Sequence, residues 1–463
     1  MIRPFGHFAP LVLAVVLVPG TRAAAAAPTS PITPGEALTV ERAVQIALEY
    51  HPAQQAAQAS AAAGVERIGE ARAALLPQVL GAAEYLRATD NGIGSTTYIN
   101  PGGFPREPST GRHVNQLTET FNNYLAGISA YQYLYDFGRT RGLIDQRRAE
   151  ADADAARLQL VQFDLVFQVT QAYYALVAAR EIVRVFEQAV GQRQQQVHEA
   201  EVKAAAGLKP EIDVYTAHAA LARVKLQLVD AQNAAATAKV TLDNAMGLGE
   251  SPPEYHQATA LSYSAVPAGV DPFVQQALDQ RPDLKMLLDE ARAVGAQIDQ
   301  YRSAYLPSVG AAAGYDLRGQ DATPGNNYYA GIVITWPLFN GFQTDHQVAE
   351  ATLRQQAIGH GIQDLRQLVI LQVKRSFLDW QASVERVHQA EQTLDASRVE
   401  LQLANQRYAA GLGSIIELTD AEQRFTEDEA LRVKALAGFS IAKAALDRDA
   451  ASGLPDVSQP PAG

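Results

Sequence analysis

The stretch ARAALLPQVLGAAEY at 71–85 decides the fold of this chain, because a close match, YRSAYLPSVGAAAGY, stands at 301–315. In both stretches a helical pattern stops at a Leu-Pro pair, ending at Pro77 and Pro307, and an alternating pattern follows. The residue before a proline is pushed toward extended backbone, so each Leu-Pro pair marks a change from helix to strand. The match predicts an internal repeat in which each copy contains a helix followed by a strand.

Three further pairs of matching segments occur in the same order in the two halves. They are VQIALEYHP at 44–52 against VQQALDQRP at 274–282, 134–138 against 338–342, and AAAGL around Gly207 against YAAGL around Gly411. Chance similarity between Ala-rich helices does not easily produce matched Pro, Gly and aromatic positions in one order. The interval from Pro77 to Leu134 is roughly 26 residues longer than its counterpart, as expected for repeats that differ in a loop.

Each copy also predicts a very long helix. The run from Arg139 to Ala206 contains no proline, and its apolar residues recur about every 3.6 positions, which is typical of an amphipathic helix. At 1.5 Å per residue this helix would span about 100 Å. A run of similar length covers 343–410, and Gly207 and Gly411 suit the left-handed position that ends a helix. Shorter helices are expected to return over 210–246 and 414–450.

Four alternating segments predict β-strands, at about 79–86, 124–135, 309–318 and 328–338. The third alternates over about ten residues, the length of a tilted membrane strand, and tyrosines crowd all four. Since the smallest closed membrane barrels use eight strands, several chains would have to share one barrel. A periplasmic coiled-coil scaffold without a pore, capped by soluble hairpins, is the alternative.

Composition excludes several classes of function. The net charge of −12 argues against a nucleic-acid partner, and the lack of cysteine excludes a disulfide framework and a thiolate metal site. The nine histidines are dispersed, and no phosphate-loop, zinc-protease or G-x-S-x-G motif occurs. His198 and His218, which flank one helical turn, are interpreted as surface residues. We therefore expect no catalytic residue, no metal, no cofactor and no enzymatic activity.

The N-terminus predicts a signal peptide over 1–27, with Arg3, an apolar stretch and small residues before the cleavage site. No later apolar run is long enough for a transmembrane helix. The expected divisions of the remaining chain are a first repeat at 28–250, a linker at 251–267, a second repeat at 268–451 and a C-terminal tail at 452–463.

Together, these features resemble the TolC family of outer-membrane efflux proteins (outer membrane factors) over about 38–451. The resemblance implies a mainly α fold with membrane β-strands, built as two tandem repeats of helix, strand pair, long helix and return helix. It implies a homotrimer whose 12-stranded β-barrel lies in outer-membrane lipid and continues into a periplasmic α-helical barrel. The channel-tunnel would carry small molecules or proteins out of a Gram-negative cell, in a tripartite efflux or type I secretion system. Its implied partners are a periplasmic adaptor (membrane fusion) protein and an inner-membrane pump of the RND, ABC or MFS type.

The same resemblance carries a periplasmic gate onto named residues. Glu417 and Asp420 fall where the family has acidic rings, and a three-residue spacing puts them on one helix face. In a trimer each would form a ring of three carboxylates that favours cations, whereas an ordinary solvated helix face is the alternative. Tyr408 aligns with a gate tyrosine and Asp213 with the acidic residue of the first tip. Gly413 stands where some members have an arginine, which leaves a Tyr–Asp–Arg latch open.

The two Ala-Gly-Leu turns align with the segments that touch the adaptor in this family. The implied contact residues are Gly207, Leu208, Gly411 and Leu412. Plain helix-capping chemistry is the alternative for these turns.

Overall fold

The computed structural model describes residues 32–89, 120–249, 252–267, 269–319 and 325–452. The predicted signal peptide and most of the predicted C-terminal tail lie outside these ranges, and so does 90–119, within the interval between Pro77 and Leu134 where a loop is expected.

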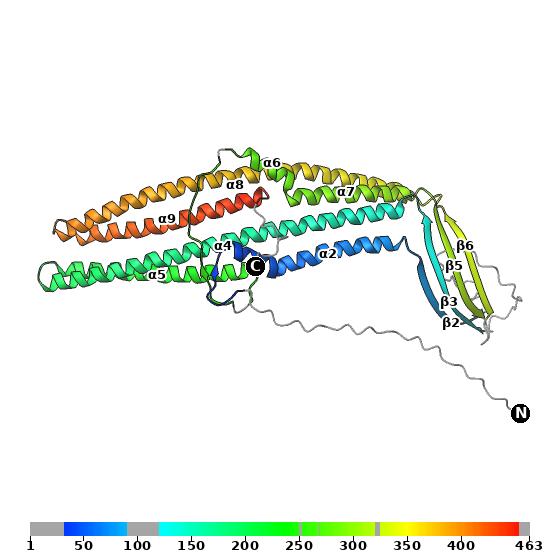
Figure 1. Ribbon diagram of the computed structural model, residues 1–463, viewed down its shortest axis with the longest axis horizontal. Helices are drawn as coiled ribbons and strands as arrows, with labels where there is room; N and C mark the ends of the chain where they lie inside the picture. Colours follow the sequence, from blue (N-terminus) through cyan, green and yellow to red (C-terminus); the bar gives the residue numbers. More distant parts are fainter. Residues whose placement is uncertain (1–31, 90–119, 250–251, 268, 320–324, 453–463) are drawn as a thin grey trace, which may run out of the picture.

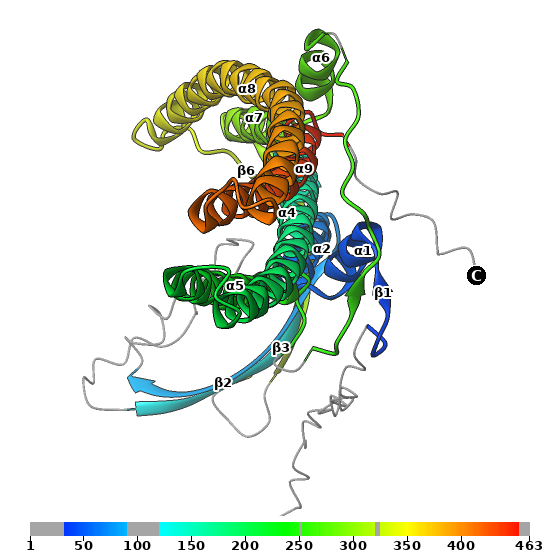
Figure 2. The same cartoon turned by 90° about the vertical axis from the view of Figure 1, so that its left-hand side faces the viewer.

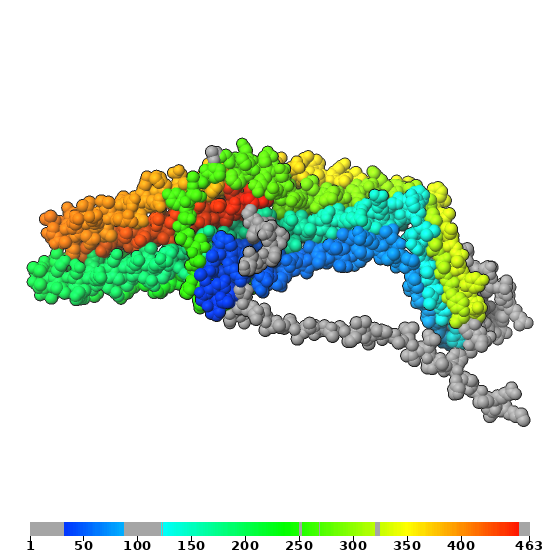
Figure 3. Space-filling model, in the orientation of Figure 1, coloured from blue at the N-terminus to red at the C-terminus, as the bar shows by residue number. Residues whose placement is uncertain are grey.

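Long helices run along most of the molecule and a four-stranded sheet stands at one end (Figures 1 and 3). The two longest helices, α4 (Arg139–Ala205) and α8 (Gln343–Ala409), contain 67 residues each. The return helices α5 (Glu211–Ala245) and α9 (Ile415–Asp449) contain 35 residues each. Each long helix and its return helix form a hairpin, and Figure 2 shows the two hairpins side by side in a curved wall.

The predicted helix ends are nearly right. Gly207 and Gly411 adopt φ of +69° and +75°, which confirms the left-handed turn that ends each long helix. Pro210 and Ser414 stand one position before the return helices, as their N-caps. The helix patterns therefore predicted the hairpins to within a residue or two.

Shorter helices pack along the half of the wall nearer the sheet (Figure 1). In the described part of the chain these are α1 (Val40–Tyr50), α2 (Pro52–Ala73), α6 (Asp271–Gln280) and α7 (Pro282–Ser303). α2 packs on α4, and α7 packs on both α4 and α8. The short strands β1 (Ala37–Leu38) and β4 (His256–Gln257) pair in parallel beside α1. Here the largest core cluster forms around Tyr173, whose hydroxyl donates to the Leu38 carbonyl at 2.8 Å.

The sheet at the end is antiparallel, with strand order β2-β3-β5-β6. Its strands are β2 (Gln78–Thr89), β3 (Thr120–Tyr135), β5 (Ser308–Gly319) and β6 (Gly325–Thr335). The prediction of a strand over 328–338 was wrong at its end, since β6 stops at Thr335. Pro337 explains the difference, because proline has no N–H to donate to a ladder and restricts the residue before it.

The two faces of the sheet differ in chemistry. Val79, Ile128 and Ile332 share one face through the strand register, and all three are exposed. On the opposite face Asp316 is paired with Arg318, with Nε and Oδ1 at 2.7 Å. One face is thus apolar and open, and the other carries charge. None of the described helices has a segment both long and apolar enough to cross a bilayer.

Candidate functional site: the paired hairpin tips

The hairpin tips lie together at the end of the molecule opposite the sheet (Figures 1 and 2). We call α4 and α5 the first hairpin, and α8 and α9 the second hairpin. Because α4 also packs against α9, the lateral order of the four helices is α5, α4, α9, α8. Most of the contact between the two hairpins of one chain is therefore made by α4 and α9, and α5 makes a smaller contact with α9.

The second tip has a tightly bonded turn. The Leu412 and Gly413 N–H groups both donate to the Arg407 carbonyl, at 2.9 and 3.0 Å. Ser414 caps α9 by accepting from the Glu417 N–H at 3.1 Å, the first half of a Ser-x-x-Glu capping box. This capping fixes the first turn of α9, the turn that carries Glu417.

An arginine that the sequence reasoning missed is bound to this turn. The Arg407 Nε donates to Glu417 Oε1 at 2.8 Å, and its Nη2 donates to the Leu412 carbonyl at 3.3 Å. A Cβ at Gly413 would lie 3.1 Å from the Arg407 Cβ and 3.2 Å from Glu417 Oε2. Gly413 thus leaves room for the Arg407–Glu417 pair. An arginine does stand at this tip, six positions before the one where the resemblance gives some family members an arginine.

Tyr408 and Asp213 are brought together from different hairpins. Tyr408 is 5% exposed and Asp213 is 9% exposed. Burial raises the pKa of the Tyr408 hydroxyl, and the nearby negative charge of Asp213 raises it further. The ammonium groups of Lys203 and Lys209 lie 5.4 and 4.5 Å from the centre of the Tyr408 ring, within cation–π range. Tyr408 therefore joins the two tips. Its ring lies beneath two lysines of the first hairpin, and its hydroxyl lies near the buried carboxylate of Asp213.

The other candidate residues are exposed. Asp420 is exposed on α9, while its neighbours Thr419 and Glu422 are contacted by Arg193 of α4. Leu208 and Leu412 are 74% and 75% exposed at the tips.

The two histidines near the first tip do not form a site with each other. Both His198 and His218 are exposed, and the His218 Nε2 lies 3.1 Å from Glu201 Oε1. The interpretation of both as surface residues is confirmed. The described residues contain no group of three side chains suited to hold a metal.

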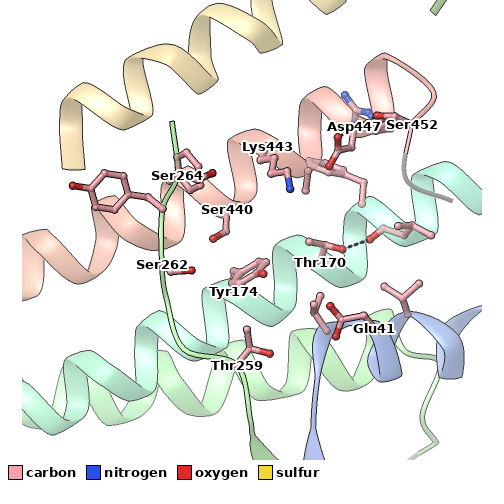
Figure 4. A pocket seen from close by; sticks show the side chains of 18 of the residues that line it. Glu41, Thr170, Tyr174, Thr259, Ser262, Ser264, Ser440, Lys443, Asp447 and Ser452 are labelled. Carbon is pink, nitrogen blue, oxygen red and sulfur yellow. Dashed lines mark hydrogen bonds between the residues drawn. The ribbon is translucent and has the colours of Figure 1, made fainter. Parts of the chain in front are cut away.

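A separate open groove of about 510 Å³ lies between α1, α4, α9 and the linker that crosses them (Figure 4). Tyr174 and Lys443 reach into it from α4 and α9, and Ser262 and Ser264 line it from the linker. Burial raises the pKa of Tyr174. The sequence patterns did not point to this groove, because its residues come from four distant segments.

The molecule has a long helical wall with paired tips at one end and a sheet with one open apolar face at the other. This is the architecture of a subunit of an outer-membrane channel. The chain belongs to the outer membrane efflux protein family, whose model matches residues 43–248 and 273–451. The predicted family, the mainly helical fold with its strand pairs and the outer-membrane location are confirmed, so the chain is an efflux channel protein that extends into the periplasm.

Similar proteins and solved structures agree with this family assignment. The chain is 25% identical to Protein CyaE of Bordetella pertussis over 391 residues, covering 83% of this chain and 78% of that one. It is also 25% identical to the alkaline protease secretion protein AprF of Pseudomonas aeruginosa over 394 residues, covering 82% and 77%. Among solved structures, the CmeC outer membrane channel of Campylobacter jejuni superposes with a TM-score of 0.74 at 17% identity, covering 89% of this chain and 85% of that one.

Proposed function

We propose that three copies of this chain form the passive exit duct of a tripartite efflux or type I secretion system. The observation that carries this proposal is the sheet. Among the described strands, β2 and β6 each pair on one side only, and one sheet face is apolar and exposed. Unpaired strand edges cannot face lipid, so β6 of one copy must pair with β2 of the next. Three copies with four strands each would close a 12-stranded barrel, an even number as in other outer-membrane barrels.

Each protomer would contribute two repeats, at 28–250 and 268–451, joined by the linker at 251–267. Continuing the curved helical walls around the threefold axis makes a tunnel that crosses the periplasm. The chain itself needs no catalytic activity, because an inner-membrane pump would supply the energy and a periplasmic adaptor would connect the two. The exposed Leu208 and Leu412, next to Gly207 and Gly411, offer small apolar contact points to that adaptor.

The gate would be formed by the second hairpin tip. Glu417 and Asp420 would project toward the threefold axis, where rings of like charge attract cations. Tyr408 and Asp213 would hold the two tips of one protomer together. The Arg407–Glu417 pair makes Asp420 the stronger candidate for a free acidic ring, because it leaves less net charge at Glu417.

The duct is tested by purifying the full chain in detergent from outer-membrane fractions and measuring its mass and its conductance in planar bilayers. A trimer that conducts ions supports the proposal. A monomer found only in the soluble periplasmic fraction would contradict it and favour the pore-free scaffold.

The gate is tested separately with the double substitution Glu417→Ala and Asp420→Ala. We expect weaker cation selectivity and weaker block by multivalent cations, because two carboxylates per protomer are removed. The pair Glu427→Ala and Asp428→Ala, further along α9, is the matched control for charge. Unchanged selectivity of the Glu417 and Asp420 variant would assign these residues to an ordinary solvated face.

A further inference from the structure

We propose that the groove between α1, α4, α9 and the linker binds a short extended peptide that carries both an ammonium and a carboxylate group. The stem peptides of the bacterial cell wall have this chemistry. The groove has a volume of about 510 Å³, and α1 and the linker, which border it, lie partway along the helical wall between the sheet and the tips (Figures 1 and 4). Because the protein extends from the outer membrane into the periplasm, the groove lies in the compartment that holds the cell wall.

Two charged side chains on opposite walls of the groove are available to a ligand. Lys443 projects from α9 and Glu41 from α1, with Tyr174 of α4 between them (Figure 4). Both charged residues are exposed, and neither forms an ion pair with any residue that the structure describes. A ligand that has one group of each charge, and lies across the groove, forms a charge-assisted hydrogen bond with each wall.

The other charged residues that line the groove have partners of their own. Arg448 donates from Nε and Nη2 to Asp449 Oδ1, at 2.9 and 2.7 Å. Asp447 accepts from the Ser452 hydroxyl at 3.1 Å. Burial raises the pKa of Asp447, and the hydrogen bond from Ser452 opposes this shift. The unpaired charges that face the groove are therefore one cation and one anion, which favours a ligand that carries both signs.

The linker supplies an extended backbone edge, which favours a peptide over a ligand without amide groups. Leu261 packs against three core clusters and so fixes the linker across the wall. The Ala258 N–H still donates to the Leu38 carbonyl at 3.0 Å. From 260 to 266, in contrast, the linker backbone forms no backbone hydrogen bond with any described residue, and most of these residues are exposed. Such an edge suits recognition by strand addition, in which main-chain hydrogen bonds supply the affinity.

Aromatic rings and hydroxyl groups complete the lining. The rings of Tyr263 and Phe439 meet edge to face with their centres 6.2 Å apart, and the Tyr263 hydroxyl donates to Glu391 at 3.0 Å. The ring of Tyr263 is thereby held at the side of the groove. Ser262 and Ser264 add hydroxyls from the linker. This mixture of rings and hydroxyls suits a short peptide with amides and small apolar side chains better than it suits a lipid chain.

The groove is formed by one chain and lies away from the edges of its wall. The helices α4 and α9 are the two middle members of the lateral order. Figure 2 shows α1 and the linker on the convex side of the curved wall, opposite the side that the proposed duct would enclose. Peptide binding at this groove therefore requires the periplasmic location and does not require a trimer.

The experiment sediments the full chain, purified in detergent, with isolated cell-wall sacculi. We expect the parent to sediment with the sacculi. Lys443→Gln and Glu41→Gln should each weaken this binding about tenfold, because each removes one charge-assisted contact. The matched controls Lys434→Gln and Glu49→Gln lie on the same two helices outside the groove, and all four positions are exposed, so every variant should fold. A parent that does not sediment with sacculi, or equal losses in the controls, would overturn the proposal.

Two soluble competitors distinguish the parts of the cell wall. The free stem peptide should release the chain from the sacculi, whereas glycan strands stripped of their peptides should not, because they lack the ammonium group. Release by the stripped glycan and not by the peptide would overturn the proposal.

Hydrogen exchange locates the bound peptide on the chain. The stem peptide should slow amide exchange at 260–266, since the added strand would bond to these N–H groups. Binding without slower exchange there would contradict the assignment to this groove. If exchange at 260–266 is already slow without peptide, and becomes fast in a chain that ends at Ser452, the groove belongs to residues 453–463 and the proposal fails. Failure of the duct is seen separately, in the mass and conductance of the same preparation.

Discussion

The two hairpin tips place the same kinds of residues at equivalent positions and use them differently. Lys203 and Asp213 of the first tip correspond to Arg407 and Glu417 of the second. In the second tip the base and the acid bond to each other at 2.8 Å. In the first tip both face Tyr408 of the second, the lysine over its ring and the aspartate near its hydroxyl.

Tyr408 accounts for this difference, because its counterpart in the first hairpin is Ala204. An alanine leaves the basic residue next to it free to reach across to the other tip. A buried tyrosine offers a ring for the lysines and a hydroxyl for the carboxylate. Duplication thus preserved the backbone of the hairpins, and one aromatic side chain made the two tips complementary.

The largest effect is expected when the second tip is made like the first by Tyr408→Ala. Truncation of a buried aromatic side chain costs about 3–5 kcal/mol, and here the loss falls on the contact between the tips. We expect faster amide hydrogen exchange in the turns of both hairpins, and a higher basal conductance. Exchange that accelerates in the second hairpin alone would show that Tyr408 does not join the tips.

The conservative change Tyr408→Phe is the control for that experiment. It keeps the ring beneath Lys203 and Lys209 and removes only the hydroxyl near Asp213. Its effect should be well below that of Tyr408→Ala. Equal effects would assign the whole contact to the hydroxyl.

A smaller effect is expected from Gly413→Lys, which introduces the residue found at the equivalent position, Lys209. The new Cβ would crowd Arg407 and Glu417 at 3.1 and 3.2 Å, and such overpacking costs about 1–3 kcal/mol. Hydrogen exchange at the second turn should accelerate. The reciprocal Lys209→Gly removes a cation from over the Tyr408 ring but adds no crowding, so exchange should accelerate less than in Gly413→Lys. Equal acceleration in both variants would contradict the steric account.

Sequence reasoning succeeded where the signals are local. The periodic apolar residues, Gly207, Gly411 and the Leu-Pro pairs set helix and strand boundaries within a few residues, because each acts on its own backbone. It failed at the end of β6, where the alternating pattern was followed past Pro337. The charged pairs needed the three-dimensional structure, since Arg407 and Glu417 meet across a turn and Arg193 and Glu422 meet across two hairpins.

The N-caps of the two return helices give a prediction of intermediate size. Ser414 accepts a hydrogen bond from the Glu417 N–H, whereas the equivalent Pro210 makes no side-chain cap. Ser414→Ala should cost about 1 kcal/mol at the start of α9, the usual loss for a helix cap. Pro210→Ala should change the start of α5 much less. The comparison is measured by hydrogen exchange of the first turn of each helix, and equal losses would show that Ser414 capping does not distinguish the tips.

The smallest effect on stability is expected from Glu417→Gln, which removes the charge from the Arg407 pair. Both side chains are about half exposed, and pairs of this kind contribute less than about 1 kcal/mol because water and salt screen them. Stability and selectivity should therefore separate. Helix protection near Leu412 should stay close to that of the parent, while conductance measured at low salt should become less cation-selective, with a difference that shrinks as salt is added. A large loss of protection with unchanged selectivity would make Glu417 a structural residue of the turn and leave Asp420 as the acidic group of the gate.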